Sequence, residues 1–341
     1  TKIIFMPVAL TDFHGTIGGV SGRRASRLQS RQGPYVMELT AADKLIGSVR
    51  KFRKDIFLVG FKTTTGLTED EQYLEGLKLV KEASCNLVLA NDNLTRLNMV
   101  ISPEEARYAV TRDRHQALTT LVEMAYKRSH LTFTRSTVVA GDMIPWESPL
   151  VYPTLRTVVN HCIRRGAYKP FNGATAGHFA CKLDPQTFLT SVRKTNFNHL
   201  GQIGLVKVVT DGPDNVIAYG AKPSVGGQSQ RIVFQDHPEY DCIVHFHSPK
   251  RPTSPVPTVS QFEYECGSHE CGQNTSNGLQ RFGNLSAVYL SEHGPNIVFH
   301  HDIDPAEVIR FIEANFDLEQ KTGGYVSLGP ILKEAAHAEK Q

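Results

Sequence analysis

Apolar runs alternate with amphipathic stretches along the first third of the chain. Three continuous apolar runs are typical of strands that are covered on both faces, and they lie at residues 3–10, 56–61 and 87–90. Thr68 and Glu71 have the spacing of a capping box and precede an amphipathic stretch, which predicts a helix. A second helix is predicted over residues 114–127. Strands that alternate with helices in this order predict a parallel sheet.

The remainder of the chain shows shorter apolar runs between polar turns. An amphipathic stretch from Leu155 to Cys162 predicts a helix, and Asp304 with Pro305 predicts the start of another. Strand-like runs lie between them, at residues 187–189, 205–209, 242–247, 287–290 and 297–299.

The breaks in this pattern divide the chain. Residues 129–145 contain Gly141 and Pro145 and lack sustained periodicity, which predicts a linker. We therefore expect a first domain at residues 1–128, a second at 146–330 and a polar tail at 331–341.

Composition narrows the classes of function. The 341 residues are 40% hydrophobic and 21% charged, which is typical of globular proteins long enough for two domains. A net charge of +3 without a long basic run argues against nucleic acid as a partner. No apolar stretch reaches the ~20 residues of a membrane span. Six scattered cysteines argue against a disulfide framework and favour the cytoplasm. The chain opens on Thr1 and at once on a strand, so we expect an N-terminal segment to be missing.

Three histidines form the clearest candidate site. His245 and His247 share one face at the end of a predicted strand, and His293 directly follows the apolar run 287–290. Three neutral imidazoles with an open fourth position are what a catalytic zinc ion, or a similar divalent metal, requires. A His-x-His pair alone also fits two ordinary histidines.

Five segments around these histidines add to that evidence. They are Gly177-His-Phe-Ala180, Phe188-Leu-Thr-Ser191, Lys222-Pro-Ser224, His245-Phe-His-Ser248 and Glu292-His-Gly-Pro295. In this order and spacing they resemble the class II aldolase/adducin family over roughly 180 residues. The resemblance implies an α/β/α domain, a homotetramer and a zinc ion held by the three histidines. It also implies that the metal polarises a carbonyl or enediolate oxygen while an acid–base residue moves protons.

The resemblance also implies an anion-binding site. Gly177, Thr190 and Ser224 fall at the positions that hold a phosphate or carboxylate in the family. Arg193 and Lys194 follow closely, where they add positive charge for an acidic substrate or, alternatively, belong to a solvated loop.

The sequence departs from the family pattern at two points. His178 stands where the family has asparagine, and Gly226 where it has the catalytic glutamate. A replacement acid is available from Glu265 or Glu270, in the segment after the His-x-His strand. Two other interpretations of that segment are a surface loop and a second metal site, the latter held by Cys266, His269 and Cys271.

Three segments of the first domain resemble the C-terminal portion of the phosphopantothenate–cysteine ligase family: residues 7–13, 58–63 and 89–92. That family implies a Rossmann-like fold, dimerisation and use of CTP or ATP to activate a carboxylate. The match places Asp12 and Phe61 beside the nucleotide base, Asn91 at a strand end, and Arg27 at the position of a phosphate-contacting lysine. Asp and Asn also commonly end strands in ordinary turns. The glycine-rich first half of the ligase has no counterpart in this sequence.

Taken together, we expect an α/β protein in which a partial Rossmann-like parallel-sheet domain is followed by a class II aldolase-like α/β/α domain. The leading hypothesis for its function is a zinc-dependent lyase that acts on a small carbonyl or phosphorylated substrate and forms a homodimer or homotetramer. Two alternatives are amide formation by the CTP- or ATP-dependent first domain and a non-catalytic, adducin-like assembly module.

Overall fold

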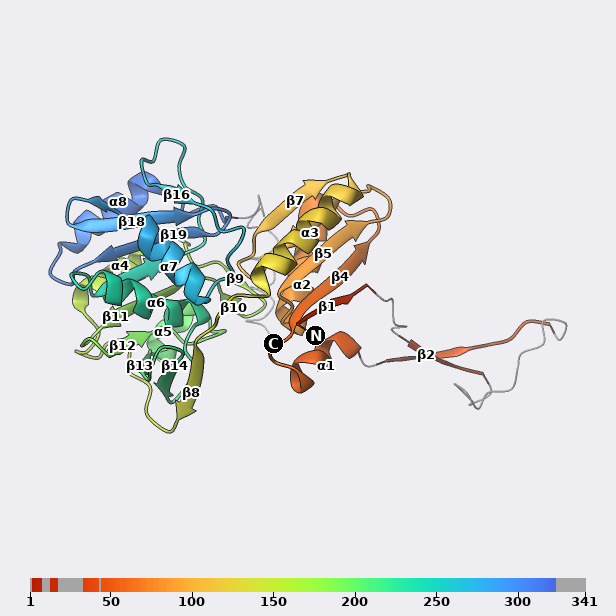
Figure 1. Ribbon diagram of the computed structural model, residues 1–341, viewed down its shortest axis with the longest axis horizontal. Helices are drawn as coiled ribbons and strands as arrows, with labels where there is room; N and C mark the ends of the chain where they lie inside the picture. Colours follow the sequence, from red (N-terminus) through yellow and green to blue (C-terminus); the bar gives the residue numbers. More distant parts are fainter. Residues whose placement is uncertain (1, 8–12, 18–32, 43, 323–341) are drawn as a thin grey trace.

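The computed structural model describes residues 2–7, 13–17, 33–42 and 44–322, with backbone only for 225–229. Asp12, Arg27 and the tail 331–341 lie outside these residues. Two sheets organise the chain into two domains that lie side by side (Figure 1). Among the described helices, none has both the length and the apolar character needed to cross a membrane.

The first domain is built on a five-stranded sheet. In spatial order its strands are β1 (Ile3–Met6), β4 (Phe57–Thr64), β5 (Leu87–Asp92), β6 (Asn98–Ile101) and β7 (Arg107–Thr111). The pairs β1–β4 and β4–β5 are parallel, as the pattern predicts. The prediction of a parallel sheet does not extend to β6 and β7, which pair antiparallel. Only short turns connect β5, β6 and β7, and turns of that length join antiparallel strands.

Helices cover both faces of this sheet. They are α1 (Leu45–Phe52), α2 (Glu69–Ala83) and α3 (Arg114–Arg128). The predicted capping box is present at the start of α2. The Thr68 hydroxyl accepts from the Glu71 amide, and the Glu71 carboxylate accepts from the Thr68 amide. Tyr73 and Leu77 of α2 pack on one face of the sheet, and Leu121 of α3 packs on the other. This burial is the main source of stability for both helices.

A hairpin of β2 (Phe13–Thr16) and β3 (Glu38–Ala41) projects from this domain, away from its sheet (Figure 1). Leu39 of β3 and Val36, two residues before β3, face solvent and are 61% and 87% exposed.

The second domain contains a mixed sheet. Its spatial order is β16 (Thr258–Val259), β18 (Leu285–Leu290), β19 (Gly294–Phe299), β15 (Cys242–His245), β11 (His178–Lys182), β12 (Thr187–Thr190), β13 (Val206–Thr210), β14 (Asn215–Tyr219) and β8 (Arg135–Val139), with β17 (Gln280–Phe282) beside β18. A small pair, β9 (Pro170–Phe171) and β10 (Ala174–Thr175), lies outside it. The prediction of a linker over residues 129–145 needs correction, because this segment contains β8, which pairs in parallel with β14 of the second sheet. That pairing joins segments about 80 residues apart, beyond the reach of local periodicity.

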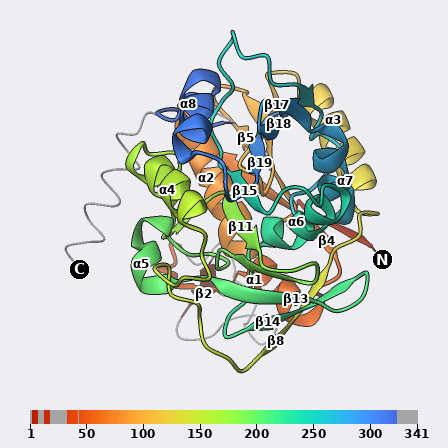
Figure 2. The same cartoon turned by 90° about the vertical axis from the view of Figure 1, so that its left-hand side faces the viewer.

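Helices form a layer on each side of this sheet (Figure 2). The helices α4 (Pro153–Arg164) and α8 (Pro305–Asn315) pack on one face, and α6 (Val225–Asp236) and α7 (His269–Gly278) lie over the other. Short turns η3 (Phe197–His199) and α5 (Leu200–Ile203) complete the domain. The Asp304 side chain caps α8 as predicted. The α/β fold class is therefore confirmed.

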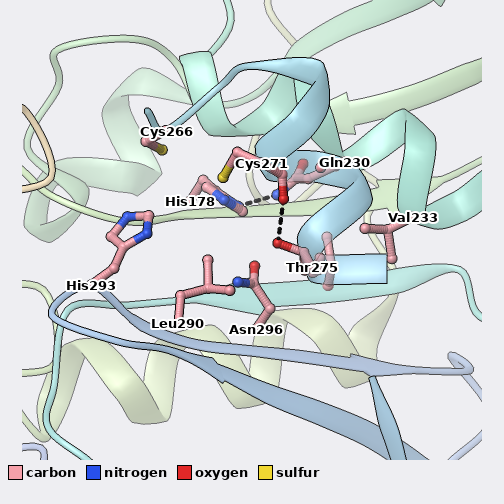
Figure 3. A pocket seen from close by; sticks show the side chains of 11 residues that line it. His178, Gln230, Val233, Cys266, Cys271, Thr275, Leu290, His293 and Asn296 are labelled. Atoms are coloured by element: carbon pink, nitrogen blue, oxygen red, sulfur yellow. Dashed lines mark hydrogen bonds between the residues drawn. The ribbon is translucent and has the colours of Figure 1, made fainter. Parts of the chain in front are cut away.

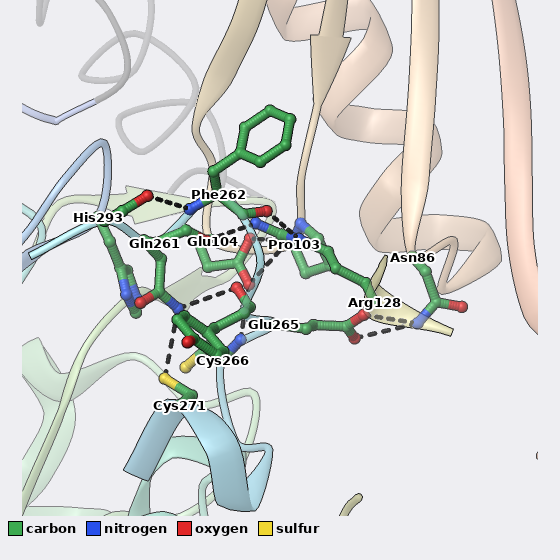
Figure 4. A network of polar contacts seen from close by, with 12 residues as sticks. Asn86, Pro103, Glu104, Arg128, Gln261, Phe262, Glu265, Cys266, Cys271 and His293 are labelled. Carbon is green, nitrogen blue, oxygen red and sulfur yellow. Dashed lines mark hydrogen bonds and ion pairs between the residues drawn. The ribbon is translucent and has the colours of Figure 1, made fainter. Parts of the chain in front are cut away.

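Charged side chains are buried between the two domains (Figure 4). Arg128 of α3 pairs with Glu104 at 3.0 Å, and neither side chain is exposed to solvent. Arg128 also donates to the carbonyl groups of Gln261 and Phe262, and Glu104 accepts from the Cys266 amide at 2.6 Å. Because each charge has several partners, the cost of its desolvation is largely offset while both residues remain.

We predict that Arg128→Met lowers the free energy of unfolding by about 3–5 kcal/mol, because Glu104 is left buried without its counter-charge. Urea unfolding of the full chain measures the loss. Arg53→Met serves as the control, since its ion pair with Asp55 lies in solvent, and it should leave stability nearly unchanged. Equal stability of the two variants would contradict the role of the buried pair.

Candidate metal centre

Strand pairing brings the three predicted histidines together. His245 ends β15 and pairs with Asn296 of β19, while His293 lies in the turn just before β19. His247 follows β15 by two residues. One ligand nitrogen from each of the three rings lies within 4.8 Å of the others. The rings are buried, so the arrangement is a compact interior cluster.

The hydrogen bonds of the cluster leave its nitrogens available for a cation. His245 Nδ1 donates to the Pro295 carbonyl at 2.7 Å, which leaves a lone pair on Nε2. That Nε2 is 3.2 Å from His293 Nε2. Two imidazole nitrogens on one tetrahedral zinc ion lie about 3.3 Å apart, from Zn–N distances of about 2.0–2.1 Å. The Nδ1 atoms of His247 and His293 are buried, and they have no hydrogen-bond partner among the described residues. The residues present therefore fit a divalent metal.

Burial sets the protonation state of the cluster. Desolvation lowers the pKa of His245 to about 4, and it also holds the pKa values of His247 and His293 well below the ordinary value, with added repulsion from neighbouring imidazoles. The three rings are thus neutral near pH 7, which is the state that binds a metal.

A cavity lies directly beside the cluster (Figure 3). His178, Gln230 and Asn296 line it together with His293 and the thiols of Cys266 and Cys271. The His178 ring lies beside His245, with 4.6 Å between ring centroids, and its Nδ1 is hydrogen-bonded to Gln230 of α6. Sequence reasoning noted His178 only as a departure from the family pattern and missed Gln230, because no spacing links residues 178 and 230.

The predicted anion-binding residues lie around the same strand ends. Gly177 has a φ of +108°, and a Cβ there would lie 2.6 Å from the His245 carbonyl oxygen, so glycine permits the close approach of β11 to β15. The Thr190 hydroxyl is buried and donates to the Phe179 carbonyl at 3.1 Å. Ser224 is the N-cap residue of α6, and its side chain makes no capping hydrogen bond.

Arg193 and Lys194 follow β12 and are exposed to solvent. The Arg193 amide donates to the Lys222 carbonyl at 3.0 Å, which brings Lys222 beside them. In the described part of the chain, none of these three side chains forms an ion pair.

The two predicted replacement acids have other partners. Both carboxylate oxygens of Glu265 accept from Asn86 of the first domain, at 3.0 and 2.9 Å. Glu270 accepts from the Thr132 amide. Within the described residues, neither hydrogen-bonds a histidine of the cluster. Burial, with repulsion from Glu104, raises the pKa of Glu265 to about 7. Gly226 lies in the first turn of α6 and carries no acid.

The alternative of a second metal on Cys266, His269 and Cys271 does not agree with the structure. These three do not form a ligand group among the described residues, and His269 is hydrogen-bonded to Thr134 instead. One further group is present among the described residues: Asp241 lies with His300 and His301.

The predicted nucleotide-binding residues Phe61 and Asn91 lie on neighbouring parallel strands. Thr63 of β4 pairs with Asn91 of β5 and donates to its side chain at 3.3 Å. Next to them, Asp92 accepts from the amides of Gly66, Leu94 and Thr95. Asp92 therefore holds the turns at this edge of the sheet.

Comparison with known proteins supports both resemblances. Residues 158–251 match the Class II Aldolase and Adducin N-terminal domain family. The chain is 34% identical over 89 residues to the Coenzyme A biosynthesis bifunctional protein CoaBC of Thermococcus kodakarensis, which covers 26% of this chain and 21% of that protein. The chain thus spans about a fifth of the length of this curated relative.

Two solved structures are also similar. L-fuculose 1-phosphate aldolase is 15% identical with a TM-score of 0.35, covering 55% of this chain and 86% of that one. The C-terminal domain of CoaBC is 16% identical with a TM-score of 0.25, covering 37% of this chain and 54% of that one. Both TM-scores are too low to support an inference about this chain.

The family match and the cluster geometry agree on the same segment, since His245 and His247 lie within the matched residues. Residues 158–251 of this chain thus match the class II aldolase and adducin N-terminal domain, and the chain also contains a region similar to the coenzyme A biosynthesis protein CoaBC.

Proposed function

We propose that the second domain is a metal-dependent lyase of the class II aldolase type, acting on a small carbonyl or phosphorylated substrate. The observation that carries this proposal is the buried cluster of three neutral histidines with converging nitrogens. His245, His247 and His293 would hold the ion, with zinc as the expected metal. When bound, such an ion supplies Lewis acidity at a carbonyl or enediolate oxygen.

The residues around the cluster have separate tasks in this proposal. The Pro295 carbonyl fixes the orientation of the His245 ring, so that its Nε2 faces the other two histidines. Gly177 and Ser224 form one side of an anion site, and Arg193 and Lys194 attract the negative end of the substrate.

Glu265 is the stronger candidate for the missing acid. Its pKa of about 7 suits proton transfer at neutral pH, and the next residue, Cys266, lines the cavity that His293 also lines. Glu270 shows no comparable burial.

The first domain supports a second candidate function. Phe61 and Asn91 lie on neighbouring strands of a parallel pair, and a region of the chain is similar to CoaBC. Binding of CTP or ATP at this edge would support a ligase-like role, and calorimetric titration of the full chain with either nucleotide tests it. A cytoplasmic location fits this proposal, since all six cysteines are free thiols.

We predict that the purified protein holds about one divalent metal per chain and that His245→Ala and His293→Ala each abolish binding, because two imidazoles hold zinc far less tightly than three. Plasma mass spectrometry of the dialysed proteins measures the metal. His115→Ala, on the exposed start of α3, is the control and should retain the metal. Unchanged metal content in both site variants would exclude this centre.

We also predict a pH dependence for the metal-free protein. The folded-state pKa of His245, about 4, lies below its ordinary value of 6.5, so the unfolded chain binds more protons between these values. Stability is therefore complete above about pH 6.5 and falls as the pH decreases toward 4. Urea unfolding at a series of pH values checks this, and His245→Gln should show a shallower slope. Parallel slopes would contradict the assignment.

We expect the chain to form a homo-oligomer through the exposed hairpin of β2 and β3. The apolar side chains of Val36 and Leu39 are 87% and 61% exposed, and a second copy would shield them from water. Light scattering after size-exclusion chromatography should show a smaller assembly for Val36→Asp than for the wild type. A monomeric wild type would disprove this expectation.

A further inference from the structure

Antiparallel pairing places a second group of metal-binding side chains at the far end of the two strands that position the candidate centre. The ladder of β15 and β19 ends at the pair of Cys242 and Phe299. Asp241 directly precedes this pair on one strand and His300 directly follows it on the other, with His301 next in the chain. The histidine of β15 in the candidate centre is four residues from Asp241, or about 13 Å along the strand. The two groups are therefore separate.

The surrounding turn holds Asp241 and His301 in fixed positions. The Asp241 side chain is only 9% exposed, and its Oδ1 accepts from the His301 amide at 2.8 Å. The Thr154 hydroxyl donates to the His301 carbonyl at 2.6 Å, and the His301 ring stacks on Tyr152 with 4.3 Å between ring centroids. Groups that are ordered before binding lose less conformational entropy when they bind an ion.

One oxygen of Asp241 faces a nitrogen from each imidazole. His301 Nδ1 is in close contact with Asp241 Oδ2, and His300 Nε2 lies 3.7 Å from the same oxygen. The distance of 3.7 Å is too long for a hydrogen bond, but it is close to the ~3.3 Å between two ligands of one tetrahedral zinc ion. One ligand atom from each of the three residues lies within 4.8 Å of the others. A bound ion would displace the proton between His301 and Asp241.

Asp302 can orient both rings for this role. Its carboxylate lies 3.5 Å from His300 Nδ1 and 3.3 Å from His301 Nε2, the two nitrogens that do not face Asp241. Protons on these nitrogens leave the lone pairs of His300 Nε2 and His301 Nδ1 directed toward Asp241, and outer carboxylates orient histidine ligands of metals in this way. The Asp302 amide also approaches His300 Nδ1, at 3.3 Å, so metal binding would replace this long hydrogen bond with one to the carboxylate.

We propose that Asp241, His300 and His301 form a second divalent-metal site, which binds zinc or a similar transition-metal ion. Two imidazoles and one carboxylate favour such an ion over magnesium or calcium, which prefer oxygen ligands. The side chains of His300 and His301 are 48% and 35% exposed, so water reaches the ion and completes its coordination. The site therefore loses its ion on dialysis and refills when metal is added, unlike the buried centre. It does not depend on the proposed lyase function.

Calorimetric titration of the dialysed full chain with zinc chloride tests the site. The His245→Ala variant, which lacks the candidate centre, should bind about one zinc ion per chain. Adding His300→Gln should weaken this binding at least about tenfold, and adding Asp302→Asn should weaken it about tenfold. His161→Gln is the matched control, because His161 pairs with Glu313 at 2.8 Å as a single imidazole and carboxylate, and zinc binding should be unchanged.

Two outcomes would overturn the proposal. In the first, folded His245→Ala binds no zinc, which leaves Asp241 as a residue that only caps the turn. In the second, His245→Ala binds zinc equally well with and without His300→Gln. Circular dichroism checks the fold of each variant. If His245→Ala does not fold, the wild type with its buried centre filled replaces it, and it should bind one further zinc ion that His300→Gln fails to bind.

Discussion

Antiparallel pairing of β15 with β11 on one side and β19 on the other is the constraint on which the candidate metal centre depends. It aligns His245 with His178 across one strand boundary and with Asn296 across the other. Because side chains alternate between faces, a shift of one residue in either pair would turn His245 away from its partners. His293 directly precedes β19, so the pairing of β19 with β15 also fixes its position. The backbone hydrogen bonds of these strands therefore hold the three imidazoles close together.

The same strand boundaries explain the glycines of the site. Gly294 has a φ of +155°, and an added Cβ would collide with the Phe246 carbonyl group. Gly177 stands in the corresponding close contact with His245. Both positions let the turns lie against β15 without a side chain between them. The close approach of the backbone at Gly177 and Gly294 to β15 and the residues after it is what allows the imidazoles to lie near one another.

Local signals in the sequence predicted the parts of this structure that depend on local chemistry. The capping box at Thr68 and the Asp304 cap needed only neighbouring residues. The metal-binding histidines could be predicted because His245 and His247 are two residues apart on one strand face and the family pattern adds His293. Contacts between distant segments carry no such signal: β8 joins the second sheet through β14, and Glu265 meets Asn86 across 179 residues.

The buried pair of Glu104 and Arg128 has a consequence for how this chain can have been assembled. A gene cut between the two halves would keep Glu104 and Arg128 together, but the pair would lose the carbonyl groups of Gln261 and Phe262 and the amide of Cys266, and the other fragment would lose the guanidinium that fills its loop of residues 261–266. A different partner domain would have to supply the same two carbonyl groups and amide, so the two halves cannot be exchanged freely for unrelated modules.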